Sequence, residues 1–108
     1  MSELNEQVKQ DVKLMVDALR ENTLDNQIRN YYLELINIFP KDLLLNPDLN
    51  KMVSYLKKNP DKYNRFVSFS LSFDTFYQNN KKFLQNNSDA NNLKDLVDTL
   101  LWALGLSN

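Results

Sequence analysis

Basic side chains are concentrated in the middle of the chain. Residues 51–82 hold seven lysine and arginine residues against two acids, Asp61 and Asp74, which gives this stretch a net charge of +5 in a chain of net charge −1. Five of these cations are close together in the sequence: Lys51, Lys57, Lys58, Lys62 and Arg65. Such cations can neutralise phosphate groups without reading bases. A solvated lysine-bearing helix surface gives the same pattern, so both interpretations stay open.

Side chains that could carry out catalysis are scarce. The chain has no histidine and no cysteine, the residues that most often act near neutral pH or bind transition metals. Carboxylates lie three residues apart in two places, Glu3 with Glu6 and Asp95 with Asp98. A working acid–base pair also needs a pocket that shifts its pKa values, and the sequence has neither a glycine-rich phosphate loop nor an EF-hand spacing. We therefore expect no enzyme activity, no metal and no cofactor.

The elements that position these residues are predicted to be helices. Gly105 is the single glycine, so the chain has almost no residue suited to the positive φ angles of hairpin turns. The apolar fraction of 43% and the length of 108 residues suit one folded domain with one core. We predict an all-α fold, a compact bundle of four to six helices forming a single domain over residues 1–108.

Three helices are read from apolar residues at helical spacing. The first covers residues 3–21. The second is expected to be capped by Asn22 or Thr23 and to run to Phe39, where Pro40 stops it. The last is expected to begin near Asp89 or Asn92 and to end at a left-handed Gly105, with Trp102 half-buried at its edge.

The tripeptide Asn-Pro-Asp occurs at residues 46–48 and again at 59–61. In both copies we expect asparagine to cap a helix, proline to take its first position and aspartate to complement its dipole. The preceding segment 41–45 is read as an apolar connection tucked against the core. Residues 78–92, rich in asparagine, are expected to form a loop with one short helical turn.

Residues 66–73 fit two patterns. Phe69, Leu71 and Phe73 alternate with serines as in a strand, whereas the phenylalanines at 66, 69, 73 and 76 keep a helical register. A lone strand would have no ladder partner, so helix is favoured. The residues expected to form the core are Leu19, Ile28, Leu35, Val53, Phe66, Phe73, Val97 and Leu101.

The stretch from Val12 to Phe39 resembles the small helical subunit of type III-A CRISPR interference complexes. The similarity is sharpest over Thr23-Leu24-Asp25-Asn26-Gln27-Ile28-Arg29-Asn30, mainly at Gln27-Ile28-Arg29, and the order of later helices also follows that family. The resemblance implies a subunit of a filament built from several proteins. It also implies that Arg29 faces the backbone of the guide or target strand.

Three classes of function remain after these observations. The first is an accessory subunit of a nucleoprotein assembly that contacts the backbone of RNA or single-stranded DNA. The second is a bacterial or phage inhibitor, immunity or anti-defence protein that blocks a protein partner, and the third is a homo-oligomeric bundle. We expect a cytoplasmic protein without a membrane segment, because no apolar run approaches ~18–20 residues and acids stand where a secretory signal carries positive charge.

Overall fold

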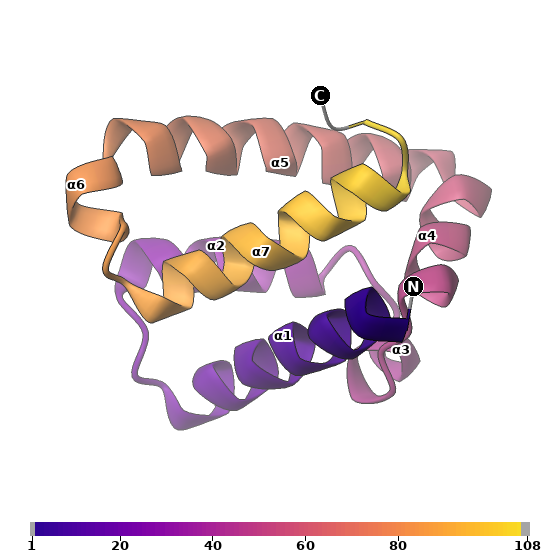
Figure 1. Ribbon diagram of the computed structural model, residues 1–108, viewed down its shortest axis with the longest axis horizontal. Coiled ribbons are helices and arrows are strands. Elements are labelled where there is room, and N and C mark those ends of the chain that lie inside the picture. The colour runs from indigo at the N-terminus through magenta and orange to yellow at the C-terminus, as the bar shows by residue number, and fades with distance from the viewer. Residues whose placement is uncertain (1, 107–108) are drawn as a thin grey trace.

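Seven α-helices joined by short turns make up residues 2–106, the part of the chain that the computed structural model describes (Figure 1). They are α1 (Ser2–Glu21), α2 (Asn26–Ile36), α3 (Lys41–Leu45), α4 (Leu49–Lys58), α5 (Pro60–Asn79), α6 (Lys81–Leu84) and α7 (Ser88–Ala103). These residues contain no strand, which confirms the all-α prediction. The helices outnumber the expected four to six because two connecting segments form the short helices α3 and α6.

The helices bury one continuous core. Helices α1 and α7 run side by side in opposite directions and make the most extensive contact between elements, while α2, α4 and α5 close the core behind them (Figure 1). The core residues of the five longer helices are Val8, Val12 and Met15 of α1, Ile28, Tyr32 and Leu35 of α2, Leu49, Met52 and Leu56 of α4, Phe66, Phe69, Phe73 and Tyr77 of α5, and Ala90, Leu93, Leu96, Val97 and Leu100 of α7. None of the described helices has the length and apolarity needed to cross a membrane.

The aromatic residues of segment 66–73 belong to α5, so the helical register is confirmed. Spacings of three and four residues place Phe66, Phe69, Phe73 and Tyr77 on one buried face. The rings of Phe69 and Phe73 stack with centroids 6.2 Å apart, and Tyr31 of α2 meets Phe73 edge-on at 5.3 Å. Such pairs add to the stabilisation from buried area, which makes the α2–α5 contact a strong part of the core.

Most of the expected core is confirmed. Five of the eight named residues are buried: Ile28, Leu35, Phe66, Phe73 and Val97. Leu19, Val53 and Leu101 pack against the core but remain partly exposed. Trp102 is 53% exposed, which agrees with its predicted half-burial. It lies seven and four residues after the exposed Asp95 and Asp98, which places it on the outer side of α7.

The two Asn-Pro-Asp copies start helices in different registers. In the first copy Asp48 is the cap: its Oδ1 accepts the backbone N–H of Lys51 at 2.9 Å, and Pro47 lies outside α4. In the second copy Pro60 takes the first helical position, as expected, but Asn59 does not cap α5 with its side chain. The Asn59 amide instead donates to the carbonyl of Tyr55 at 2.7 Å and so satisfies the end of α4.

Other helix ends also differ from expectation. Asp25 caps α2 by accepting the N–H of Gln27, whereas Asn22 takes a φ of 56° in the turn after α1. Helix α2 ends at Ile36 rather than at Phe39, and the expected loop 78–92 is mostly helical. Gly105 has a φ of +77°, and the N–H of Leu106 bonds the carbonyl of Leu101 at 2.8 Å, so the predicted left-handed cap is confirmed.

The segment 41–45 forms α3, and the expectation that it is tucked against the core is wrong in part. Leu43 and Leu44 are half-buried, but no residue of α3 is fully buried and Leu45 is 58% exposed. Consecutive residues on a helix point about 100° apart, so one short helix cannot bury three successive leucines on one side. The chain therefore leaves an apolar side chain on its surface beside α1.

Candidate functional site

The five predicted cations of the middle segment lie on consecutive helices at one end of the molecule. Lys51, Lys57 and Lys58 belong to α4, and Lys62 and Arg65 lie in the first two turns of α5. We call this set of five residues the α4–α5 corner. In Figure 1, α4 is the pink helix at the right, and α5 starts beside it and runs along the top. Four of the five side chains are exposed, and Lys62 is half-buried. Lys57 and Lys58 occupy the last turn of α4, where the helix dipole favours positive charge.

The charge of the corner is not neutralised by ion pairs. Two ion pairs are formed among the residues that the structure describes: Lys9 with Glu6 at 3.7 Å, and Lys94 with Asp98 at 2.7 Å. Neither includes a cation of the corner. The nearby Asp61 is exposed in the first turn of α5, where the helix N-terminus already stabilises its carboxylate. Positive charge at this end is therefore available to an external anion.

The corner is curved rather than flat. Lys51 lines a groove that faces α1, whereas Arg65 lines a hollow between α2 and α5 together with Glu34 and Ile38. The ammonium group of Lys62 donates to the carbonyl of Asn37, 3.5 Å away, at the C-terminal end of α2. The five cations, which are close together in the sequence, thus form a curved band around one end of the bundle.

The fold does not bring Arg29 to this band. Arg29 is half-buried in α2, and its guanidinium donates to the side-chain carbonyl of Asn22 in the turn after α1. Helix α2 begins at the left of Figure 1, and α4 lies at the right. An anion at Arg29 and an anion at the corner would therefore occupy two separate places.

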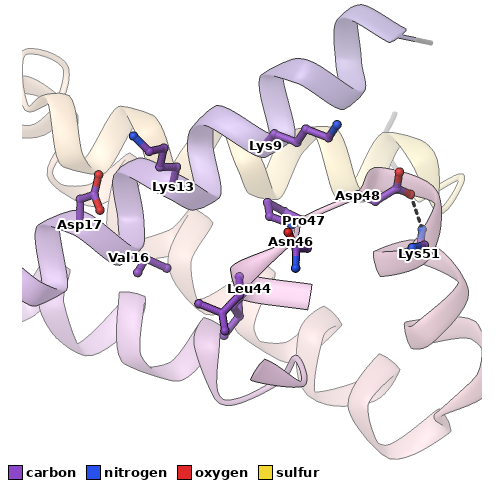
Figure 2. Close-up of a pocket in the computed structure, with 10 residues that line it drawn as sticks. Lys9, Lys13, Val16, Asp17, Leu44, Asn46, Pro47, Asp48 and Lys51 are labelled. Carbon is purple, nitrogen blue, oxygen red and sulfur yellow. Dashed lines mark hydrogen bonds between the residues drawn. The ribbon is translucent and has the colours of Figure 1, made fainter. Parts of the chain in front are cut away.

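Sequence reasoning missed a groove between α1, α3 and the start of α4 (Figure 2). Its volume is about 560 Å³. We call it the α1–α3 groove, and its lining residues are Lys9, Lys13, Val16, Asp17, Leu44, Leu45, Asn46, Pro47, Asp48 and Lys51. The signal that could have indicated it is the run of three leucines at 43–45, which exceeds what a five-residue helix can bury.

A second feature absent from the sequence analysis is a buried carboxyl group between α1 and α7. Asp11 is 2% exposed; its Oδ1 accepts from the Gln7 amide at 3.1 Å, and its Oδ2 has no hydrogen-bond partner. The Asn92 amide of α7 donates to the backbone carbonyl of Asp11 at 3.0 Å. Burial, followed by the neighbouring Asp95, raises the pKa of Asp11 from 3.8 to about 8. At neutral pH the neutral acid is therefore the main form, and it can donate a hydrogen bond.

The carboxylate pairs named for their spacing are surface groups. Glu3, Glu6, Asp95 and Asp98 are all exposed, and Glu6 and Asp98 each pair with a lysine on the same helix. Within residues 2–106 no three carboxylates gather closely enough to hold a metal ion. These four carboxylates, unlike that of Asp11, therefore lie in surroundings typical of solvated charges.

Comparisons with family models, with curated proteins and with solved structures find no match to this chain. The assignment of a function consequently depends on the charges, the exposure and the contacts described above.

Proposed function

We propose that this chain is a non-enzymatic helical subunit of a nucleoprotein assembly and that its α4–α5 corner contacts the backbone of a nucleic acid. The observation that carries the proposal is the set of five cations without an ion pair at one end of the bundle. Two lysines outside the corner, Lys9 and Lys94, pair with acids on their own helices. A phosphate backbone is the ligand that supplies several negative charges along a curved band.

The type of contact follows from the side chains available. Lysine and arginine at helix ends bind phosphate oxygens, and such contacts fix the position of a strand without selecting its sequence. Each phosphate neutralised on a single strand contributes about 0.7 to the slope of log affinity against log salt concentration. Binding at the corner should therefore be independent of sequence and strongly weakened by salt.

The resemblance to the small subunit of type III-A CRISPR interference complexes adds a role within that class. A small helical domain with the corner at one end and Arg29 at the other would have two separate backbone contacts. Two contacts on opposite ends suit a subunit repeated along a strand. Changing Arg29 should then weaken binding further in a variant whose corner is already reversed.

The test compares two pairs of adjacent lysines. The double variant Lys57→Glu and Lys58→Glu reverses charge at the corner, and Lys81→Glu with Lys82→Glu makes the same change on α6 at the other end. Fluorescence anisotropy with labelled single-stranded RNA at low salt should show a larger loss of affinity for the first variant than for the second. Equal affinities of the two variants would contradict the proposal, as would no binding by the wild type alone and within its assembly.

A bacterial or phage inhibitor or anti-defence protein that binds a protein partner is the second candidate. The observation in its favour is exposed apolar surface: Leu14 and Leu45 are 48% and 58% exposed on neighbouring parts of α1 and α3. A heterocomplex that survives nuclease treatment would support this candidate. A molecular mass that rises with protein concentration would instead support the homo-oligomeric bundle.

A further inference from the structure

We propose that a groove between α2 and α5 receives unpaired bases of the strand whose phosphates bind at the α4–α5 corner. This inference rests on the proposed contact with a nucleic acid and deepens it, because it gives the bases a site of their own on this chain. Three features carry it. The groove begins at the corner, its lining is rich in uncharged hydrogen-bonding side chains, and it contains aromatic rings.

Two adjoining hollows between α2 and α5 form this groove, and they share Glu34 and Ser72. We call the pair the α2–α5 groove. Arg65, a cation of the corner, lines one end, and Gln27 and Phe76 line the other. From Arg65 to Phe76 helix α5 advances by about 16 Å. A strand whose phosphate binds Arg65 therefore has the end of the groove beside it.

The polar lining of the groove suits bases better than phosphates. Besides Glu34 and Arg65 it consists of uncharged side chains that offer both donors and acceptors, namely Gln27, Asn30, Tyr31, Asn64, Ser68 and Ser72. The edges of unpaired bases carry the same mixture of groups. By contrast, charged residues make up half or more of the lining of the two hollows on α1.

The one carboxylate in the groove supports the same choice of ligand. Glu34 is exposed and lies where the two hollows meet, so a ligand that fills both passes it. A phosphodiester has no donor for this carboxylate and is repelled by it, whereas the amino groups of bases can donate to it. A neutral peptide would also find hydrogen-bond partners here, but it would leave the cations of the corner without anions.

Aromatic rings give the groove a flat apolar part. Tyr31 and Phe76 are both half-buried, and their ring centroids lie 5.0 Å apart. Phe69 is buried in the same lining and meets Tyr31 edge-on at 6.0 Å, which helps to fix the position of the Tyr31 ring. Bases stack on such rings largely irrespective of sequence. The groove therefore agrees with a corner that binds any sequence, and it favours a single strand, because the bases of a duplex are already paired.

The experiment compares two labelled RNA strands of equal length, one with bases and one abasic, which keeps the sugars and phosphates alone. Wild type should bind the base-containing strand about tenfold more tightly at a fixed salt concentration. Both strands should give the same slope of log affinity against log salt, because the slope reports phosphate contacts. This comparison needs no variant, so it does not depend on how any substitution folds.

Two variants place the effect in the groove. Ser72→Leu fills the middle of the groove from an exposed position of α5, and it should remove most of the tenfold difference without changing the salt slope. Thr75→Leu is the matched control, since Thr75 is exposed on the same helix and does not line either hollow. It should bind both strands as wild type does.

Equal affinities of wild type for the two strands, with a steep salt slope, would overturn the groove and leave the corner intact. Equal effects of Ser72→Leu and Thr75→Leu, or a loss with Ser72→Leu that is as large for the abasic strand, would also overturn it. A preference for bases together with a slope that Lys57→Glu and Lys58→Glu leave unchanged would contradict the corner instead. No binding of either strand would overturn both proposals.

Discussion

Ionisable side chains are in opposite states at two regions of the molecule. A buried one is mainly neutral at the contact between α1 and α7, and those of the α4–α5 corner are charged. At the α1–α7 contact the carboxyl group of Asp11 is buried, and its raised pKa keeps it mainly neutral at neutral pH. At the corner the four exposed cations have no ion pair. A charge on the buried Asp11 would destabilise the fold, and the group is mainly neutral. The charges of the corner lie in water, where they cost the fold little. We infer that the interior determines stability and that the corner is available for binding.

The largest expected effect lies in the interior. Phe73→Ala should cost about 3–5 kcal/mol of unfolding free energy, because it removes a buried ring that packs against Tyr31, Phe69 and Tyr77. Urea unfolding followed by circular dichroism measures this loss. Leu71→Ala on the exposed side of the same helix is the control and should change stability by about 0.5 kcal/mol or less. A loss under about 1 kcal/mol for Phe73→Ala would mean that the α2–α5 contact is not part of the core.

The next effect is a pH dependence at the α1–α7 contact. Asp11 has a pKa of about 8 in the folded chain against 3.8 ordinarily, so between these values the folded state binds one proton more than the unfolded state. Stability from this group is fully present below pH 3.8 and decreases as pH rises towards 8, because Asp11 ionises in the unfolded chain while burial keeps it protonated in the folded chain. Asp11→Asn should flatten this decrease, since the amide is neutral at every pH and is similar in size. A urea midpoint with the same pH slope in both proteins would contradict this assignment.

The sequence predicted features that depend on residues close together in the chain, and it did not predict those that depend on residues far apart. The helical register of Phe73 and the left-handed Gly105 follow from local spacing and backbone freedom, and both are confirmed. Asp11 was assigned to a helix that buries one face, but its contact with Asp95 joins residues far apart in the chain. The same reason explains why the α1–α3 groove was missed. It exists only once Leu45 is placed beside α1.

The cations of the candidate site show the same limit. Their sequence positions predicted that Lys51 to Arg65 would lie where one helix ends and the next begins. The structure places Lys57, Lys58 and Lys62 there, whereas Lys51 lies in the first turn of α4, at its opposite end. The direction in which each side chain leaves the bundle was not predictable. Lys62 turns to the carbonyl of Asn37, a residue of a different part of the chain, and Arg29 is held by Asn22 at the other end.

A smaller effect tests which residue of the first Asn-Pro-Asp copy caps the N-terminus of α4. Asp48→Ala should cost about 1 kcal/mol, because the Asp48 carboxylate accepts the Lys51 N–H at the start of α4. Asn46→Ala, in the same tripeptide, should be nearly neutral, because Asn46 is exposed and lies beyond the end of α3. Thermal melting of the two variants measures the difference. A larger loss for Asn46→Ala would show that asparagine caps α4, as the sequence pattern had suggested.

A small change in stability accompanies the most informative change in binding. The double variant Lys57→Glu and Lys58→Glu reverses two exposed charges in the last turn of α4, where the helix dipole disfavours negative charge, so its unfolding free energy should fall by about 1 kcal/mol. The decisive measurement is the salt dependence of its affinity for labelled single-stranded RNA, beside wild type and the Lys81→Glu and Lys82→Glu variant. We predict that the corner variant binds more weakly and that its slope of log affinity against log salt is flatter by about 1.4, equivalent to two lost phosphate contacts. An unchanged slope, or the same flattening in the α6 variant, would contradict the assignment of the α4–α5 corner as a nucleic-acid contact.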